Sequence, residues 1–134
     1  MARALAIDFG LKRCGIAVSD EMKMIASGLT TVDAADLMHF LSDYFEQEKV
    51  DEIIIGLPKH KDGNVNDVEQ NIQLLIKELE KKFQNKKIIR IDERFTSKMA
   101  FQTMIDSGMG KKKRRDKKLV DQVSATIILQ SYLY

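Results

Sequence analysis

The chain has 134 residues, of which 44% are hydrophobic and 31% charged, a composition typical of one folded domain with a buried core. This balance excludes a disordered chain, a collagen-like repeat and a coiled coil, and no run approaches the roughly 18 apolar residues of a membrane span. The single cysteine, Cys14, excludes an internal disulfide and a cysteine-rich zinc site. We therefore expect residues 1–134 to form a single domain in a reducing cytoplasm.

The net charge of +2 hides a local concentration of positive charge. Of the 22 basic residues, seven lie between Lys111 and Lys118, so the rest of the chain has 15 basic residues against 19 acidic ones. A basic segment on a slightly acidic body is typical of a binding site for a polyanion such as nucleic acid. A solvated basic loop would give the same pattern, and both interpretations stay open at this point.

The first third of the chain has the pattern of β-strands. Ala4–Ile7 and Cys14–Val18 are short apolar runs separated by a turn that contains Gly10, which predicts a hairpin. Gly28–Val32 is rich in β-branched residues and predicts a third strand.

The hydrophobic period then changes to that of a helix. Asp33 is a candidate N-cap, and the apolar stripe of the helix that follows consists of Leu37, Phe40, Leu41, Tyr44 and Phe45. The next element, Glu52–Ile55, contains three consecutive isoleucines and predicts a strand that is buried on both faces.

The last part of the chain alternates between helices and strands. An amphipathic helix is predicted from Val68 to Phe83, a strand at Lys87–Ile91, a helix capped by Thr96 and a final apolar helix from Leu119. The order β-β-β-α-β-α-β-α-α predicts a mixed sheet with helices packed on it. The last two strands should run parallel to the first, because helical crossovers join them.

Three acidic positions interrupt apolar stretches: Asp8, the pair Asp92 and Glu93, and Asp121. A carboxylate buried without a partner is costly, so such a group protonates, forms an ion pair or binds a metal ion. Three carboxylates at one edge of a sheet would repel each other unless a cation lay among them. Mg²⁺ prefers oxygen ligands of this kind.

Each acid also has an ordinary structural explanation: a turn residue for Asp8, a surface ion pair with Arg94 for Asp92 or Glu93, and a helical ion pair with Lys117 or Lys118 for Asp121. The combination favours a metal site, because all three positions lie where the sheet and the last helix would converge. Ser124 and Ala125 are small residues that would let this helix approach the sheet closely.

Strand alternation offers a choice between the two neighbouring acids. It groups Glu93 with Ile89 and Ile91, and Asp92 with Arg90. We expect the Arg90 side of the strand to face outward, so Glu93 is the preferred metal ligand.

Five motifs occur in order along nearly the whole chain: Ala6–Asp20, Ile55–Pro58 with Asp62-Gly63, Asp92–Ser97, Asp121–Ala125 and Ile127–Leu133. In these motifs the sequence resembles the YqgF family, bacterial proteins similar to Holliday-junction resolvases. One departure is Cys14, where the family usually has an aliphatic residue.

The resemblance implies an RNase H-like α/β fold, with a mixed five-stranded sheet and helices packed on both faces. It also implies a nuclease that hydrolyses phosphodiester bonds in structured nucleic acid, with Mg²⁺ or Mn²⁺ held by Asp8, Glu93 and Asp121. The residues that would contact nucleic acid are Lys12, Arg13, Arg94, Lys111, Lys112, Lys113, Arg114 and Arg115.

The usual assignment in the family is maturation of the 5′ end of the 16S rRNA precursor during ribosome biogenesis. The expected partners are precursor rRNA and ribosomal particles, with no membrane. A junction-resolving DNA endonuclease and a non-catalytic nucleic-acid-binding factor are the alternatives. RNA or DNA as substrate, endo- or exonucleolytic cleavage, one or two metal ions, and a monomer or a homodimer all stay open.

Overall fold

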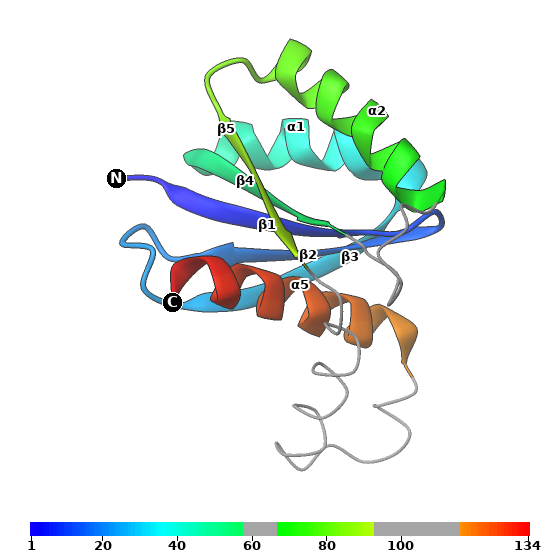
Figure 1. Cartoon of the computed structure of the whole chain (residues 1–134). Coiled ribbons are helices and arrows are strands. Elements are labelled where there is room, and N and C mark those ends of the chain that lie inside the picture. Colours follow the sequence, from blue (N-terminus) through cyan, green and yellow to red (C-terminus); the bar gives the residue numbers. More distant parts are fainter. Residues whose placement is uncertain (58–66, 93–115) are drawn as a thin grey trace.

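The computed structural model describes residues 1–57, 67–92 and 116–134 (Figure 1). Its elements in chain order are β1 (Arg3–Phe9), β2 (Arg13–Ser19), β3 (Ala26–Asp33), the 3₁₀ helix η1 (Ala34–Asp36), α1 (Leu37–Gln47), β4 (Val50–Leu57), α2 (Asp67–Lys82), β5 (Lys87–Asp92) and α5 (Lys117–Leu133). The predicted order is confirmed throughout these residues, whereas the helix predicted after Thr96 lies outside them. None of the helices described is long and apolar enough to span a bilayer.

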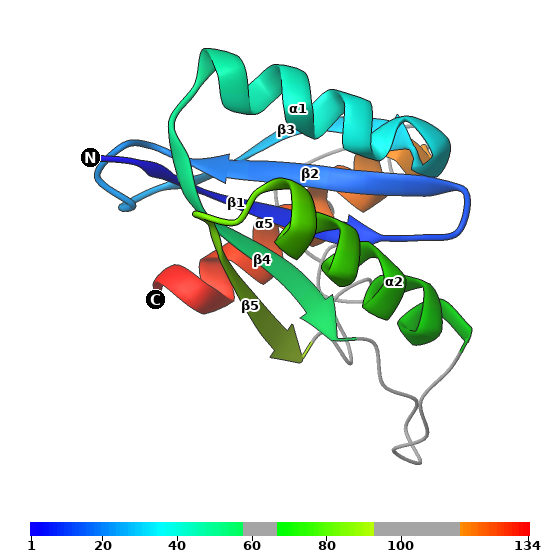
Figure 2. The same cartoon turned by 90° about the horizontal axis from the view of Figure 1, so that it is seen from above.

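The five strands form one mixed sheet in the order β3-β2-β1-β4-β5. The β1–β2 and β2–β3 pairs are antiparallel, as expected for hairpins, and the β1–β4 and β4–β5 pairs are parallel. The register aligns Ile7 with Ile55 and Leu57 with Asp92, so the carboxyl ends of the three parallel strands share one edge (Figure 2). This edge positions the candidate site.

Helices cover both faces of the sheet, with α1 and α2 on one side and α5 on the other (Figure 1). The isoleucines of β4 divide between the two sides: Ile53 and Ile55 pack under α1 and α2, and Ile54 packs under α5. This confirms that β4 is buried on both faces. The α5 side is lined by small residues, because the fully buried β1 and β2 side chains there are Ala4, Ala6 and Ala17.

The first helix begins later than its candidate cap suggested. Asp33 occupies the N-cap position of the 3₁₀ helix η1, but its side chain makes no capping hydrogen bond, and α1 itself begins at Leu37. The predicted apolar stripe is confirmed, since Leu37 and Leu41 are fully buried and the three aromatic residues pack against the same core.

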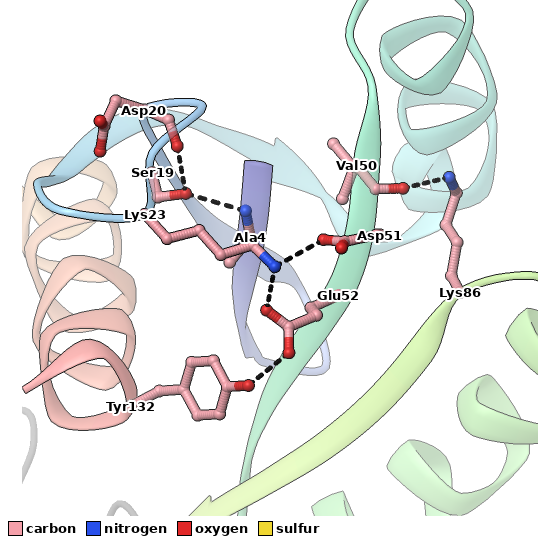
Figure 3. A network of polar contacts seen from close by, with 9 residues as sticks. All are labelled: Ala4, Ser19, Asp20, Lys23, Val50, Asp51, Glu52, Lys86 and Tyr132. Carbon is pink, nitrogen blue, oxygen red and sulfur yellow. Dashed lines mark hydrogen bonds and ion pairs between the residues drawn. The ribbon is translucent and has the colours of Figure 1, made fainter. Parts of the chain in front are cut away.

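A polar network anchors the carboxyl end of α5 to the edge of the sheet opposite the candidate site (Figure 3). The Glu52 carboxylate on β4 accepts a hydrogen bond from the Tyr132 hydroxyl of α5 and forms an ion pair with Lys23 Nζ at 2.5 Å. Lys23 also pairs with Asp51 at 2.9 Å. Because these contacts hold the far end of the helix, they also restrict how its first turns lie over β1 and β2.

Candidate metal and nucleic-acid site

Asp8 lies near the carboxyl end of β1, on the face of the sheet that α5 covers. Alternation along the strand places it with Ala4 and Ala6, which pack against α5. Its direct partner on β2 is Gly15. Asp8 is therefore a half-buried strand residue and is not part of the hairpin turn.

Gly15 is a point of close approach between α5 and the sheet. A Cβ atom on Gly15 would lie 2.0 Å from the carbonyl oxygen of Asp121 and 2.4 Å from its carbonyl carbon. No side chain fits in this space, so the α5 backbone at Asp121 packs directly on the strand partner of Asp8. Ser124 and Ala125, one turn further along α5, are both buried in the same interface.

The pKa of the Cys14 thiol is affected by both carboxylates. Burial raises its pKa to about 11, and the negative charges of Asp8 and Asp121 contribute in the same direction. Both acids are therefore within electrostatic reach of one side chain. The thiol itself stays protonated near neutral pH and is a poor nucleophile.

Arg13 forms an ion pair with Asp121 that joins the start of β2 to the start of α5. Arg13 Nε donates to Asp121 Oδ2 at 3.1 Å, and the two side chains are 28% and 26% exposed. Within the described residues, Asp121 forms this ion pair and none with Lys117 or Lys118, the partners suggested by helical spacing. The pair brings a predicted phosphate-binding residue into contact with a predicted metal ligand.

The other predicted site residues are divided between the described and undescribed parts of the chain. Lys12 is exposed in the β1–β2 turn, next to Arg13. Glu93, Arg94 and the basic residues Lys111, Lys112, Lys113, Arg114 and Arg115 lie outside the described residues. In the part that is described, no group of three or more His, Cys, Asp or Glu side chains gathers as a metal site.

The orientation expected for Arg90 was wrong. Its Nη groups donate to both carboxylate oxygens of Glu69 on α2, at 2.7 and 3.0 Å, and its side chain also reaches the carbonyl oxygens of Ile55 and Gly56. This side of β5 is therefore covered by α2 and does not face solvent. The hydrogen bonds from Arg90 lower the pKa of the Glu69 carboxyl, so the pair remains charged at neutral pH.

The alternation of β5 is nevertheless as expected. Ile89 and Ile91 pack on the α5 side of the sheet, the side on which Asp8 lies. Asp92, opposite Leu57 in the register, follows the alternation of Arg90 on the α2 side. The Arg90 side of β5 does not face solvent, but strand periodicity still separates Glu93 from Asp92.

The side chains of Asp8 and Asp121 fit a hard divalent cation. Their oxygen atoms are the ligands that Mg²⁺ takes in proteins, and two carboxylates leave positions for water and phosphate oxygens. Both residues are half-buried, so they are partly accessible from solvent. The Arg13 guanidinium offsets the negative charge of the Asp121 carboxylate.

Two features of the site were not found from the sequence. The Arg13–Asp121 pair spans 108 positions, and no local pattern indicates such a contact. Gly15 did carry a signal, because a glycine inside a strand often marks a close approach of another backbone.

Comparison with known proteins identifies the family. The model of the family described as "RuvX: Holliday junction resolvase" matches residues 2–134. A relative from Christiangramia forsetii is 59% identical over 134 residues, covering 100% of this chain and 99% of its own. One from Bacteroides fragilis is 50% identical over 133 residues, covering 99% and 96%. Both are named "Putative pre-16S rRNA nuclease".

A solved structure supports the fold independently of the sequence comparisons. Fowlpox virus resolvase, in a complex with its substrate Holliday junction DNA, superposes with a TM-score of 0.60 over 98% of this chain and 96% of its own, at 12% identity. This likeness confirms the RNase H-like α/β fold. With the family match over nearly every residue, it follows that the chain belongs to the RuvX family of Holliday junction resolvases, the family to which the YqgF motifs pointed, and is a nuclease.

Proposed function

We propose that this nuclease matures the 5′ end of the 16S rRNA precursor in the cytoplasm, with Mg²⁺ or Mn²⁺ as its cofactor. The observation that carries the proposal is the packing of α5 at Asp121 against Gly15, the strand partner of Asp8. This packing puts two carboxylates at one edge of the sheet. The names of relatives that are 48–59% identical support precursor rRNA as the substrate.

In this proposal Asp8, Glu93 and Asp121 hold the cation. A bound divalent cation would make a water nucleophilic and stabilise the charge on the leaving oxygen. Asp8 lies within a paired strand, so its carboxylate is held by a rigid element. Lys12 lies in the β1–β2 turn and Arg13 at the start of β2, in contact with Asp121, and these two residues would bind the backbone phosphates on either side of the scissile bond.

The choice between the neighbouring acids gives a first test. Glu93→Gln is expected to reduce cleavage far more than Asp92→Asn, because strand alternation assigns Asp92 to the α2 side. The measurement is the single-turnover rate of each variant with Mn²⁺. If Asp92→Asn is the inactive variant and Glu93→Gln is active, the assignment of strand faces is wrong.

The basic run gives a second test. Replacing Lys111, Lys112, Lys113, Arg114 and Arg115 by glutamine is expected to weaken binding to all nucleic acids and to change the saturated rate little. Phosphate contacts contribute affinity without sequence information, and each lost contact flattens the plot of log affinity against log salt by roughly one unit. A salt titration checks this. An unchanged salt slope would mean that these basic side chains face solvent and do not contact nucleic acid. A large fall in the cleavage rate at saturating substrate would mean that they act at the scissile phosphate.

The substrate is tested by offering the purified protein matched nucleic acids with Mn²⁺. These are a 5′-extended hairpin from the 16S rRNA precursor, a four-way DNA junction and an unstructured single strand. We expect the precursor to be cleaved fastest, at one position. Preferential cleavage of the junction would support the resolvase alternative. Tight binding without cleavage of any substrate would support a non-catalytic binding factor.

A further inference from the structure

The guanidinium of Arg13 is only partly used by the contacts that the structure describes. Its Nε group donates to Asp121 Oδ2 at 3.1 Å, a single contact rather than the two parallel bonds of a bidentate pair. Within residues 1–57, 67–92 and 116–134, the structure gives its Nη groups no hydrogen bond. The Arg13 side chain is 28% exposed, so it is partly accessible to solvent.

Arg90 provides a contrast to this arrangement. Arg90 uses its Nε and both Nη groups, on the Glu69 carboxylate and on two carbonyl oxygens, and is a structural residue. Among the described residues, no hydrogen bond is made by the planar Nη edge of Arg13. A guanidinium matches the oxygens of a phosphate with two parallel hydrogen bonds, which an ammonium group does not.

We propose that Arg13 couples the two ligands of this site: it neutralises Asp121 in the free protein, which weakens cation binding, and turns its Nη edge to a nucleic-acid phosphate when substrate arrives. The proposal rests on the proposed function and adds a regulation of the same site. Arg13 then acts on the substrate phosphate directly and on the cation through Asp121. The site would reach its full affinity for a cation only when a substrate phosphate is bound to Arg13 and offsets the guanidinium charge.

The expected coupling arises because the Arg13 guanidinium and a cation compete for the Asp121 carboxylate. The Arg13 guanidinium and a divalent cation are both attracted to the Asp121 oxygens, so either one reduces the gain from binding the other. A phosphate at Nη offsets the guanidinium charge and supplies an oxygen ligand for the cation. Binding of substrate and binding of cation should therefore strengthen each other, as linkage requires.

The test measures two affinities without any cleavage. Mn²⁺ binding to the metal-free protein is followed by calorimetry, and binding of a labelled 16S precursor hairpin is followed by fluorescence anisotropy in EDTA. In Arg13→Gln, we expect Mn²⁺ to bind about fivefold more tightly and the RNA about fivefold more weakly, the size expected for a part-exposed ion pair. A purely structural role would weaken both affinities together.

Lys117→Gln is the matched control. It also removes one positive charge near Asp121, one helical turn away, but it breaks no ion pair that the described residues show. We expect its Mn²⁺ affinity to change by less than about twofold, in line with the small effect of an exposed charge. Equal changes in both variants would overturn the proposal, because the effect would then come from the loss of any nearby positive charge and not from the Arg13–Asp121 ion pair.

Two further outcomes separate this inference from the proposed function. If the wild type binds Mn²⁺ and cleaves RNA while Arg13→Gln leaves both affinities unchanged or weakens both, the coupling is wrong and the nuclease site stands. If neither the wild type nor Arg13→Gln binds Mn²⁺, the metal site fails and the coupling fails with it. Melting temperatures in EDTA confirm that each variant is folded.

Discussion

Replacing Asp8 by asparagine is expected to reduce cleavage by at least about 100-fold, because even groups that only support a metal ligand are worth roughly 10–100-fold. The substitution keeps the size of the side chain and removes its negative charge. Because Asp8 is opposite Gly15, on which α5 packs at Asp121, we also expect the change to reduce repulsion between the two carboxylates. In EDTA the variant should therefore melt at the wild-type temperature or above it.

The measurement combines single-turnover rates with the rise in melting temperature that Mn²⁺ produces. Asp8→Asn should lose most of this rise, since binding to the native state is what stabilises it. Asp36→Asn is a suitable control: Asp36 is exposed, lies just before α1 and makes no side-chain capping hydrogen bond. A variant at Asp8 that is markedly less stable in EDTA would identify a structural residue and remove the main support for the metal site.

Gly15→Ala is expected to damage stability and metal binding together. The new methyl group would lie 2.0 Å from the carbonyl oxygen of Asp121, so α5 must move away from the sheet. Overpacking usually costs about 1–3 kcal/mol in the free energy of unfolding, and we expect the upper part of this range because the obstacle is backbone. The same displacement would carry Asp121 away from Asp8 and lower the affinity for Mn²⁺.

Gly28→Ala provides the comparison within the same helix–sheet interface. Its Cβ would meet Gln122 Nε2 at 2.7 Å and Cγ at 2.8 Å, so the Gln122 side chain must change rotamer, whereas the obstacle at Gly15 is the backbone of α5. Urea unfolding of both variants should place the midpoint of Gly15→Ala well below that of Gly28→Ala. Equal midpoints would mean that α5 shifts easily over β2, and the position of Asp121 would then not depend on Gly15.

The sequence by itself determined the elements and their order. Short apolar runs on either side of a turn predicted the first two strands, and the stripe from Leu37 to Phe45 predicted α1, because both patterns reflect which side chains must leave water. The three isoleucines of β4 predicted a strand buried on both faces, and helical crossovers implied parallel pairing. Asp8 and Asp121 stand out in the sequence because they interrupt apolar stretches, and the family motifs contain both residues.

Only the tertiary structure decided which side chains meet. Arg90 was expected to face outward because a charged residue in a strand usually does, yet Glu69 from α2 covers it. The partner of Asp121 is Arg13, from the other end of the chain, and not a lysine one turn away. Local patterns record burial and period, whereas ion pairs such as these depend on the packing of α2 and α5 against the sheet. That packing rests on contacts between residues far apart in sequence, at Gly15 above all, and it alone brings the two acids to one edge.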